Sequence, residues 1–403
     1  MTGTGESHKE RTIGQAKPFG HQSPPLRTGI GMWASRYQSP KVITHFARKV
    51  EATGYVDQLV VWDQLMNWFP QGLWEPKFTP LAGVCPDADS LCPDPFAAVA
   101  FALSGVERVG FAVATDSLRR EPAELAQTLL TLATATEGRA TLFLGAGEAR
   151  HVIPFGRKRS LGIKRLEEAL PILRLLLKED KPVDFDGQVW KMRDAFLGNG
   201  GKDRRPEVMA MGSGPRLVAA ALRYADGFST GAPFVFADPA EYGKVIRGYK
   251  QTLVDLGRGN EPFSFALHHI AFLCDGKDDF ERYVDNPLLK WYAATGGRIN
   301  QADWAKEGIE PVMPLDWHYA FKMLPGSMTR DELLAIADRV PPEMVRKTFF
   351  YGTPEEVAAE IRPFAEQGAD CHLIADVSGL VFETNPELRI ERLAEVCRLV
   401  KAG

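Results

Sequence analysis

Short apolar segments alternate with longer amphipathic segments along most of the chain. Residues 140–144 are apolar except for Thr141, as in a buried strand, whereas residues 163–178 place leucine and isoleucine at helical spacing. Strands are predicted at 26–33, 56–62, 106–114, 140–144, 207–211, 226–230, 263–274 and 371–375. Each is followed by a predicted helix. Eight strand–helix units favour one parallel (β/α)8 TIM barrel, an α/β fold, over a doubly wound open sheet.

Capping residues and prolines mark the ends of the helices. Ser39 and Pro40 are typical of an N-cap and the first helical residue, and Gly54 is expected to end that helix. Thr353 and Glu356 flank Pro354 in the pattern of a capping box. Helices are predicted at 40–53, 95–103, 122–136, 163–178, 215–224, 239–256, from 354 onward and at 386–400, with a small hairpin at 183–193.

Two segments are too long to be plain connections. Residues 63–93 carry several Trp, Phe and Pro residues, and a loop of that length is usually a lid or a binding wall. Residues 274–352 form an insertion between the seventh strand and the seventh helix, and we expect it to cover the carboxyl ends of the strands. Its aromatic residues include Trp291, Tyr292, Trp304, Trp317 and Tyr319. The predicted organisation is a polar tail, 1–25, and a single barrel domain, 26–403.

Composition narrows the classes of partner. The 403 residues carry a net charge of −4, which argues against nucleic acid as a main partner. No apolar run approaches the roughly 18 residues that a membrane span needs, and the N-terminus lacks the apolar core of a secretory signal. The five cysteines have no CxxC spacing and are interpreted as reduced thiols in a cytoplasmic protein. No motif predicts a metal site.

Candidate chemistry gathers where the fourth strand ends. Gly145 and Gly147 follow the apolar run, and Glu148 comes directly after them. Glycines there let backbone N–H groups approach a ligand, and a carboxylate at the mouth of a barrel suits proton transfer. A tight turn that needs glycine explains the same residues about as well. Asp63, at the end of the second strand, also allows two interpretations. Its carboxylate either acts on a ligand or caps local N–H groups.

Other polar clusters allow two interpretations each. Gly212, Ser213 and Gly214 follow the fifth strand and open a helix, so they form either a phosphate site that Arg216 assists or a simple loop. The pair 119–120, two arginines after the third strand, is interpreted as a solvated pair at a helix start. His268 and His269 lie in one strand and point to opposite faces, so they do not bind one metal.

Several of these stretches together resemble a known family. The chain is similar to the bacterial-luciferase-like flavin and deazaflavin oxidoreductases, and within them to the coenzyme F420-dependent branch of the phthiodiolone ketoreductase type. The resemblance runs from about residue 26 to the end of the chain. The stretches that carry it are 60–64, 109–115, 139–148, 206–226 and 350–356.

The resemblance implies a cofactor at the carboxyl-terminal mouth of the barrel, coenzyme F420 or alternatively FMN. It implies a strained, non-proline cis peptide beneath the ring, at Ala112–Val113. It also implies a proton-donating role for Glu148 and a place beside the ring for Asp63. The remaining cofactor-binding residues that it implies are Thr115, Gly145, Gly147, His151, Gly212, Ser213 and Gly214. Trp68 and Trp74 would form an apolar substrate wall, and the family is expected to be homodimeric.

One residue departs from the pattern of the family. Deazaflavin members usually carry Asp-His after the second strand, and this chain has Asp63-Gln64. Glutamine is able to hydrogen-bond a substrate oxygen, but it does not take up or release a proton as histidine does. The expected function is hydride transfer between the deazaflavin C5 and a carbonyl or activated C=C of a hydrophobic substrate. The alternatives are an FMN-dependent monooxygenase and a non-catalytic flavin-type cofactor-binding protein.

Overall fold

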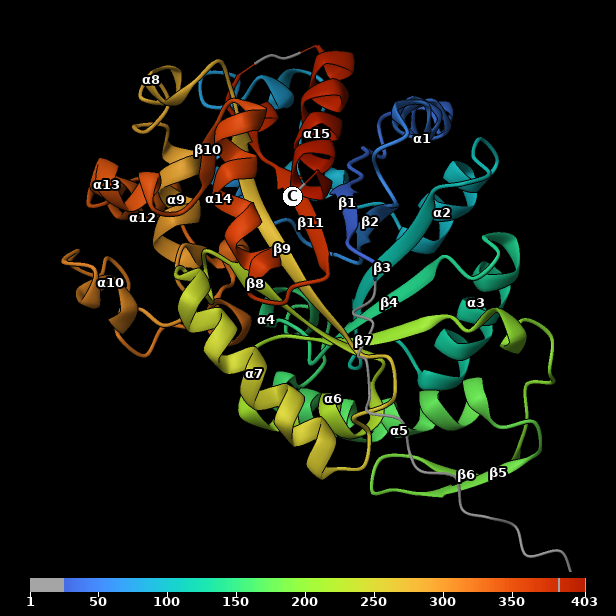
Figure 1. Ribbon diagram of the computed structural model, residues 1–403. Coiled ribbons are helices and arrows are strands. Elements are labelled where there is room, and N and C mark those ends of the chain that lie inside the picture. The colour runs from blue at the N-terminus through green and yellow to red at the C-terminus, as the bar shows by residue number, and fades with distance from the viewer. Residues whose placement is uncertain (1–24, 383–384, 403) are drawn as a thin grey trace, which may run out of the picture.

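The computed structural model confirms the predicted TIM barrel (Figure 1). It describes residues 25–382 and 385–402, so nearly all of the predicted tail lies outside the described residues. The strands of the barrel all run parallel: β1 (Arg27–Gly31), β2 (Gln58–Trp62), β3 (Gly110–Asp116), β4 (Ala140–Gly145), β7 (Glu207–Met211), β8 (Gly227–Ala232), β9 (Ser264–Leu273) and β11 (Cys371–Asp376). Pairing of β8 with β9 and of β11 with β1 closes the sheet.

The predicted helices follow the strands and cover the outside of the barrel. They are α1 (Lys41–Thr53), α2 (Pro95–Leu103), α3 (Pro122–Ala135), α5 (Gly162–Lys178), α6 (Pro215–Tyr224), α7 (Pro239–Asp255), α14 (Pro354–Glu366) and α15 (Pro386–Lys401). Thr353 and Glu356 form the predicted capping box of α14. The start of α1 was predicted one residue early, because Pro40 is the N-cap and Lys41 the first helical residue.

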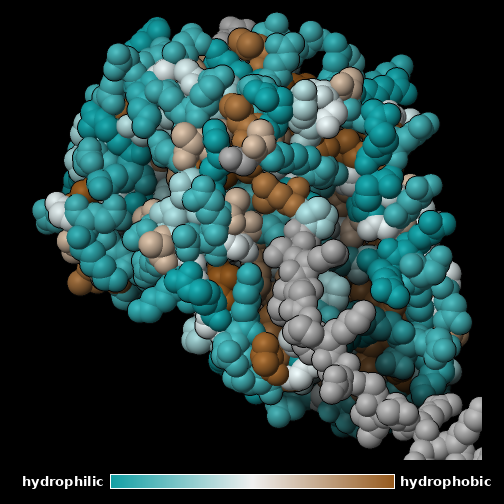
Figure 2. Space-filling model, viewed as in Figure 1, coloured by the Kyte–Doolittle hydropathy of each residue, from teal (hydrophilic) through white to brown (hydrophobic). Residues whose placement is uncertain are grey.

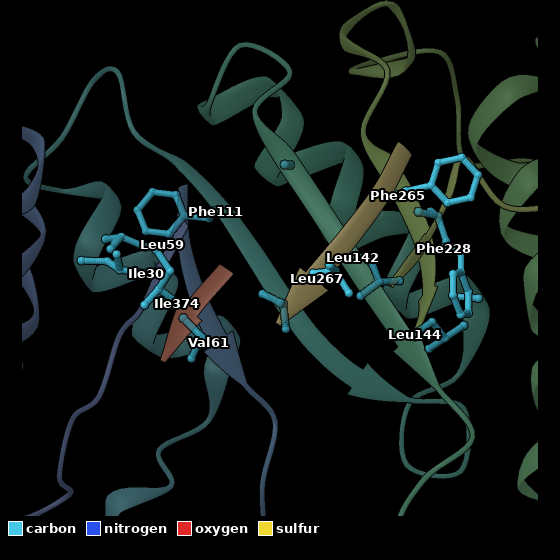
Figure 3. Packing of buried hydrophobic residues seen from close by; sticks show 14 of the residues in the cluster. Ile30, Leu59, Val61, Phe111, Leu142, Leu144, Phe228, Phe265, Leu267 and Ile374 are labelled. Carbon is cyan, nitrogen blue, oxygen red and sulfur yellow. The ribbon is translucent and has the colours of Figure 1, made fainter. Parts of the chain in front are cut away.

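Alternate residues of each strand divide the core into two layers. The helix-facing layer contains large side chains from many strands, ten of which Figure 3 labels, among them Ile30, Leu59 and Phe111. The layer inside the barrel is built around Val60, Ala112 and Phe143. Burial of each large apolar side chain is worth about 1.5–3 kcal/mol, so both layers stabilise the closed sheet. A closed and filled barrel is what holds the ends of the strands in fixed places.

The remaining helices and strands are short and lie outside the eight strand–helix units of the barrel. The predicted hairpin is present as β5 (Val183–Asp186) and β6 (Lys191–Ala195). The short helices are α4 (Ala149–Val152), η1 (Gln71–Leu73), η2 (Pro80–Gly83), η3 (Ala88–Leu91), η4 (Arg159–Leu161), η5 (Lys202–Arg204) and η7 (Ser378–Leu380). The insertion contains α8 (Lys277–Phe280), α9 (Pro287–Gly296), α10 (Ala302–Lys306), α11 (Tyr319–Lys322), η6 (Pro325–Ser327), α12 (Arg330–Asp338), α13 (Pro342–Arg346) and β10 (Phe350–Gly352).

The insertion and the long loop after β2 together form the lid. They share a separate hydrophobic core, to which Phe69 and Trp74 of the loop and Trp291 and Trp304 of the insertion belong. β10 pairs with the last residues of β9, and α11 contacts α4 just beyond β4. Figure 1 shows α9, α10, α12 and α13 gathered on one side of the barrel, away from the β5–β6 hairpin. Parts of the insertion therefore lie at the carboxyl ends of β9 and β4, and its function as a lid stays a prediction.

The outer surface is mainly hydrophilic on the face shown in Figure 2, with hydrophobic residues scattered between polar ones. Within the described ranges, no helix combines the length and the apolar character needed to cross a bilayer.

The cis peptide expected at Ala112–Val113 is not present. Both residues lie in the middle of β3, where regular ladders with β2 and β4 continue through them. The cis bond found in the described part of the chain is Ala232–Pro233, at the end of β8. An uninterrupted ladder on both sides of β3 leaves the backbone at Ala112 in the ordinary trans geometry.

A buried carboxyl group near the amino-terminal end of the barrel gives a prediction on stability. Burial raises the pKa of Asp370 to about 7. The N–H of Phe265 donates to one oxygen and partly opposes this rise, whereas the other oxygen has no partner in the described residues. Between about pH 4 and 7 the native chain thus holds a proton that the unfolded chain has lost, so stability falls as pH rises through this window.

We therefore expect Asp370→Asn to stabilise the protein more at pH 8 than at pH 5, by about 2–3 kcal/mol at most. Urea unfolding at the two pH values measures this difference. The exposed Asp186→Asn, on the β5–β6 hairpin, is the control. An equal effect of Asp370→Asn at both pH values would show that Asp370 is charged in the native state.

Candidate active site

The backbone after β4 positions Glu148 at the mouth of the barrel. Gly147 adopts a positive φ of +86°, and a Cβ there would lie 2.8 Å from Leu118 Cδ1. The predicted tight turn is therefore present, and it needs glycine. Glu148 then precedes α4 in an extended conformation, and its side chain is 27% exposed. Its carboxylate is held at the protein–solvent boundary rather than enclosed in the core.

Arg150 connects Glu148 to the lid. Its side chain is 1% exposed, and its Nε donates to Glu148 Oε2 at 2.8 Å. Its Nη1 donates to the Met66 carbonyl at 3.0 Å, and the guanidinium lies 5.0 Å from the centre of the Trp68 ring. Charge-assisted hydrogen bonds of this kind fix both partners. One carboxylate oxygen is thus occupied by Arg150.

His151 is a neutral hydrogen-bonding group. Burial, with the nearby charges of Arg150 and Arg119, holds its pKa well below the usual value. Its Nδ1 accepts from the Leu65 N–H at 3.3 Å, so the ring proton sits on Nε2. Nε2 is 3.8 Å from Glu148 Oε2. His151 therefore presents an N–H towards Glu148, beside the loop that follows β2.

Asp63 is engaged by the protein on both oxygens. Thr115 Oγ1 donates to Oδ2 at 2.7 Å, and Arg120 reaches Oδ2 at 2.8 Å and Oδ1 at 3.3 Å. Arg119 lies 3.1 Å from Oδ2. In the described residues these partners are side chains, not the local backbone N–H groups that one of the two interpretations proposed. Asp63 and Thr115 join the ends of β2 and β3 to each other, and a role for either in contacting a cofactor stays a prediction.

The interpretation of Arg119 and Arg120 as a solvated pair is wrong. The side chain of Arg119 is 5% exposed, and its Nε donates to Asp116 Oδ2 at 2.7 Å. Arg119 therefore lies between Asp63 and Asp116, and Arg120 joins Asp63 to Asp94. Asp116 ends β3 itself, but Asp63 and Asp94 come from the end of β2 and from the loop after it, so the sequence did not show that these carboxylates bury the pair.

The predicted wall residues occupy different environments. Trp68 donates from Nε1 to Thr295 Oγ1 at 3.1 Å, and its ring centre lies 4.8 Å from that of Tyr319 and 5.2 Å from that of Tyr292. Trp74 is 4% exposed in the core of the lid, and its N–H is taken by the Cys85 carbonyl at 2.8 Å. Trp68 thus packs beside Arg150 and two tyrosines, and its role as a substrate wall stays a prediction, whereas Trp74 supports the lid from within. Gln64 is half-buried, with Oε1 3.6 Å from Cys92 Sγ.

The floor of the mouth is aromatic. Trp62 of β2 stacks on Trp33 with ring centres 5.1 Å apart, and it lies 6.4 Å from the ring of His268. Burial lowers the pKa of His268 to about 4, and its Nε2 has no partner in the described part of the chain. His269 points to the other face, as predicted, and bonds to His372 at 2.9 Å.

Of the two predicted cofactor-binding residues in β3, only one has its side chain inside the barrel. Ala112 packs inside the barrel, and Val113 packs in the helix-facing layer. A contact of Val113 with a ligand in the barrel therefore has to come from its backbone.

The glycine cluster after β7 leaves helical N–H groups open. Gly214 is the N-cap of α6, Pro215 is its first residue, and no side chain caps the helix. Among the described residues, no atom lies within 4 Å of the place that a Cβ on Gly214 would take. First-turn N–H groups with no partner favour an anion. Arg216 does not assist, because it pairs with Glu167 at 2.8 Å on an exposed surface.

The importance of two residues of the site, Arg150 and His268, was not recognised from the sequence. Arg150 follows Glu148 by two positions, but nothing in the sequence showed that the two side chains pair. His268 was interpreted only as half of a strand pair. The aromatic content of the insertion was the available signal for Tyr292 and Tyr319, but the sequence did not show which aromatic residues face the mouth.

A comparison with known families agrees with this geometry. The family model described as luciferase-like monooxygenase matches residues 20–371. The chain belongs to this family. This match confirms the resemblance to luciferase-like oxidoreductase enzymes that was seen in the sequence.

Individual relatives give the comparison more detail. A phthiodiolone/phenolphthiodiolone dimycocerosates ketoreductase of Mycobacterium kansasii is 30% identical over 286 residues, 70% of this chain and 74% of the relative. An F420-dependent glucose-6-phosphate dehydrogenase of Amycolatopsis mediterranei is 26% identical over 86% of this chain and 91% of the relative. A solved F420-dependent secondary alcohol dehydrogenase in complex with an F420-acetone adduct shares the fold, with 21% identity and a TM-score of 0.68, over 94% of this chain and 99% of its own.

Proposed function

We propose that this protein is a coenzyme F420-dependent oxidoreductase that transfers a hydride between the deazaflavin and a carbonyl or activated C=C of a hydrophobic substrate. The observation that carries the proposal is the Glu148–Arg150–Trp68 cluster at the barrel mouth, beneath the lid. The names of the two curated relatives, a ketoreductase and an F420-dependent dehydrogenase, support the same chemistry. At 30% identity or below, neither identifies the substrate.

The described residues fit a cofactor with a flat ring and a phosphate. The neutral Nε2 of His268 is buried without a partner, beside the stacked Trp33 and Trp62. This floor suits an aromatic heterocycle with hydrogen-bonding edges. The open N-terminus of α6 suits a phosphate. Residues Gly145, Gly147 and Gly212–Gly214 would let the backbone approach the cofactor, and His151 would border it.

The chain's own residues would orient the reactants and handle the proton. Reduced coenzyme F420, when bound, supplies a hydride from C5. Glu148 would exchange the proton through Oε1, because Oε2 is held by Arg150. His151, neutral with its proton on Nε2, would keep the carboxylate in place. Gln64 would bind substrate oxygen without titrating.

The substrate side of the site is aromatic. Trp68, Tyr292 and Tyr319 come from the long loop, α9 and α11, and they pack against one another beside Arg150. Such walls favour an apolar substrate held over the cofactor ring. Within this proposal, Trp68 is the substrate-binding wall, and Trp74 acts only through the packing of the lid.

A second candidate is an FMN-dependent monooxygenase. The description of the matching family model favours it directly. In that case the same mouth would hold FMN and exclude water from oxygen chemistry. The homodimer, the cytoplasmic location and the non-catalytic binding role stay predictions from the sequence.

Side-by-side binding of coenzyme F420 and FMN separates these functions. We expect fluorescence titration of the full chain to show binding of F420 at least about tenfold tighter than that of FMN, a difference of about 1.4 kcal/mol. Ser213→Asp, which puts a negative charge at the start of α6, is expected to weaken binding through its effect on the phosphate. The control is Asp203→Asn on η5, at the opposite end of the barrel. Tighter binding of FMN would favour the monooxygenase, and binding of neither would contradict both.

A further inference from the structure

Two tyrosines of the lid, Tyr292 and Tyr319, pack against Trp68. Trp68 also contacts Arg150, which forms the ion pair with Glu148. The ring of Tyr319 lies 4.8 Å from the Trp68 ring at an interplanar angle of 47°, and the ring of Tyr292 lies 5.2 Å from it at 35°. Arg150 contacts the same indole and bonds to Glu148. The two phenols and the carboxylate are therefore arranged around Trp68 and Arg150.

The backbone of the lid fixes both rings. Tyr292 lies within α9, whose N-cap Asn286 bonds to the Leu288 N–H. Trp291, its neighbour in α9, donates from its indole nitrogen to the Trp68 carbonyl at 3.0 Å. Tyr319 is the first residue of α11, which packs against α4, and the helix is capped by His318. Rigid placement of this kind is what a binding group in a site needs.

Both hydroxyl groups are free to bind a ligand. Neither phenol oxygen makes a hydrogen bond to a residue in the described ranges, and neither is enclosed, because both side chains are half-buried. Tyr242 gives a contrast within the chain, since its hydroxyl is enclosed without a partner between barrel and helices. The hydroxyls of Tyr292 and Tyr319 are not enclosed in this way, and the negative charge of Glu148 acts on both.

The surroundings keep both phenols protonated. Burial raises the pKa of Tyr319, and the negative charge of Glu148 raises it further. Burial likewise raises the pKa of Tyr292. A phenol that holds its proton at neutral pH is a hydrogen-bond donor rather than an acid. Donation by such groups to an oxygen is strongest where charge accumulates on that oxygen.

We infer that the hydroxyl groups of Tyr319 and Tyr292 form a paired hydrogen-bond site for the carbonyl oxygen of the substrate. This inference rests on the proposed function, and it narrows the substrate class to carbonyl compounds whose apolar part packs on Trp68. The pair binds the oxygen as negative charge develops on it, and Glu148 remains the source of the proton. A substrate without an oxygen at the reacting centre leaves both hydroxyls unpaired, which weakens its binding.

The infrared carbonyl stretch tests the site without the cofactor. The probe is 2-undecanone labelled with ¹³C at the carbonyl, bound to the full-length chain. We expect the wild-type band at lower frequency than that of the ketone in hexane, because hydrogen bonds weaken the C=O bond. The shift should be smaller in Tyr319→Phe and smallest in the double variant with Tyr292→Phe, in which Gln64 can still donate to the ketone oxygen. The matched control is Tyr283→Phe, a lid tyrosine that stacks on Phe382 at 5.0 Å.

Kinetics with reduced F420 provide the second readout. Each single Tyr→Phe change at 292 or 319 is expected to lower kcat by about 10²-fold with little change in KM, because the bond strengthens as charge develops. Titration of oxidised F420 should give the same Kd for all variants. A wild-type band that matches that of the double variant, or no bound ketone at all, would overturn the inference. Absence of F420 binding with the infrared shift intact would refute the proposed function and leave the tyrosine pair standing.

Discussion

Replacing Glu148 with glutamine is expected to lower turnover by about 10²–10⁴-fold while leaving the affinity for coenzyme F420 nearly unchanged. This range is typical of the loss of a positioned acid or base. Glutamine preserves the size of the side chain and an oxygen that accepts from Arg150, so the contact of Arg150 with Trp68 should persist. Only the ability to release a proton is removed. Stopped-flow oxidation of reduced F420 by 2-undecanone measures the turnover, and fluorescence titration measures the affinity.

Glu167→Gln is the matched control for this variant. Glu167 also pairs with an arginine, Arg216, but on the exposed surface between α5 and α6. The Glu167→Gln variant should have the same turnover number as the wild type. If Glu148→Gln kept its turnover within about threefold of the wild type, Glu148 would not be the proton donor. A large loss of affinity would indicate instead that Glu148 holds the cofactor.

The repeating strand–helix pattern was sufficient to predict the barrel. α2, β7 and α6 have the predicted bounds, and the capping box at Thr353 is present. These features depend on residues close together in the sequence, where spacing and capping chemistry determine the conformation. The insertion was predicted from its length, which is too great for a plain connection.

Side-chain contacts between residues that are far apart in the chain could not be predicted from the sequence. Arg120 and Asp63 are 57 positions apart, and Trp68 and Thr295 are 227 positions apart. Charge and aromatic type are visible in a sequence, but burial depends on which strand ends and loops meet in the folded chain. For the same reason Arg119 looked solvated, Trp74 looked like a ligand-facing wall, and Arg150 was not recognised. The glycines and Glu148 were found because a local turn places them.

We expect Arg119→Met to destabilise the protein by about 3–5 kcal/mol, the range observed when one partner of a buried ion pair is removed. Arg119 lies between two buried carboxylates, and methionine would fill much of its volume without its charge. Asp63 would keep Arg120 and Thr115, but Asp116 would keep only backbone N–H donors from Leu118 and Arg119. The shift of the urea unfolding midpoint measures the loss.

Arg216→Met is the control for Arg119→Met. It shows whether the loss of stability comes from the burial of Arg119 or from the removal of an ion pair as such. Arg216 makes two hydrogen bonds to Glu167, as strong in geometry as those of Arg119, but its side chain is 62% exposed. Exposed pairs are worth about 0–1 kcal/mol, so this variant should unfold close to the wild type. Equal midpoints for the two variants would mean that burial of Arg119 adds nothing. A loss confined to Arg119→Met would show that the join between the ends of β2 and β3, next to the proposed cofactor site, depends on a buried charge network.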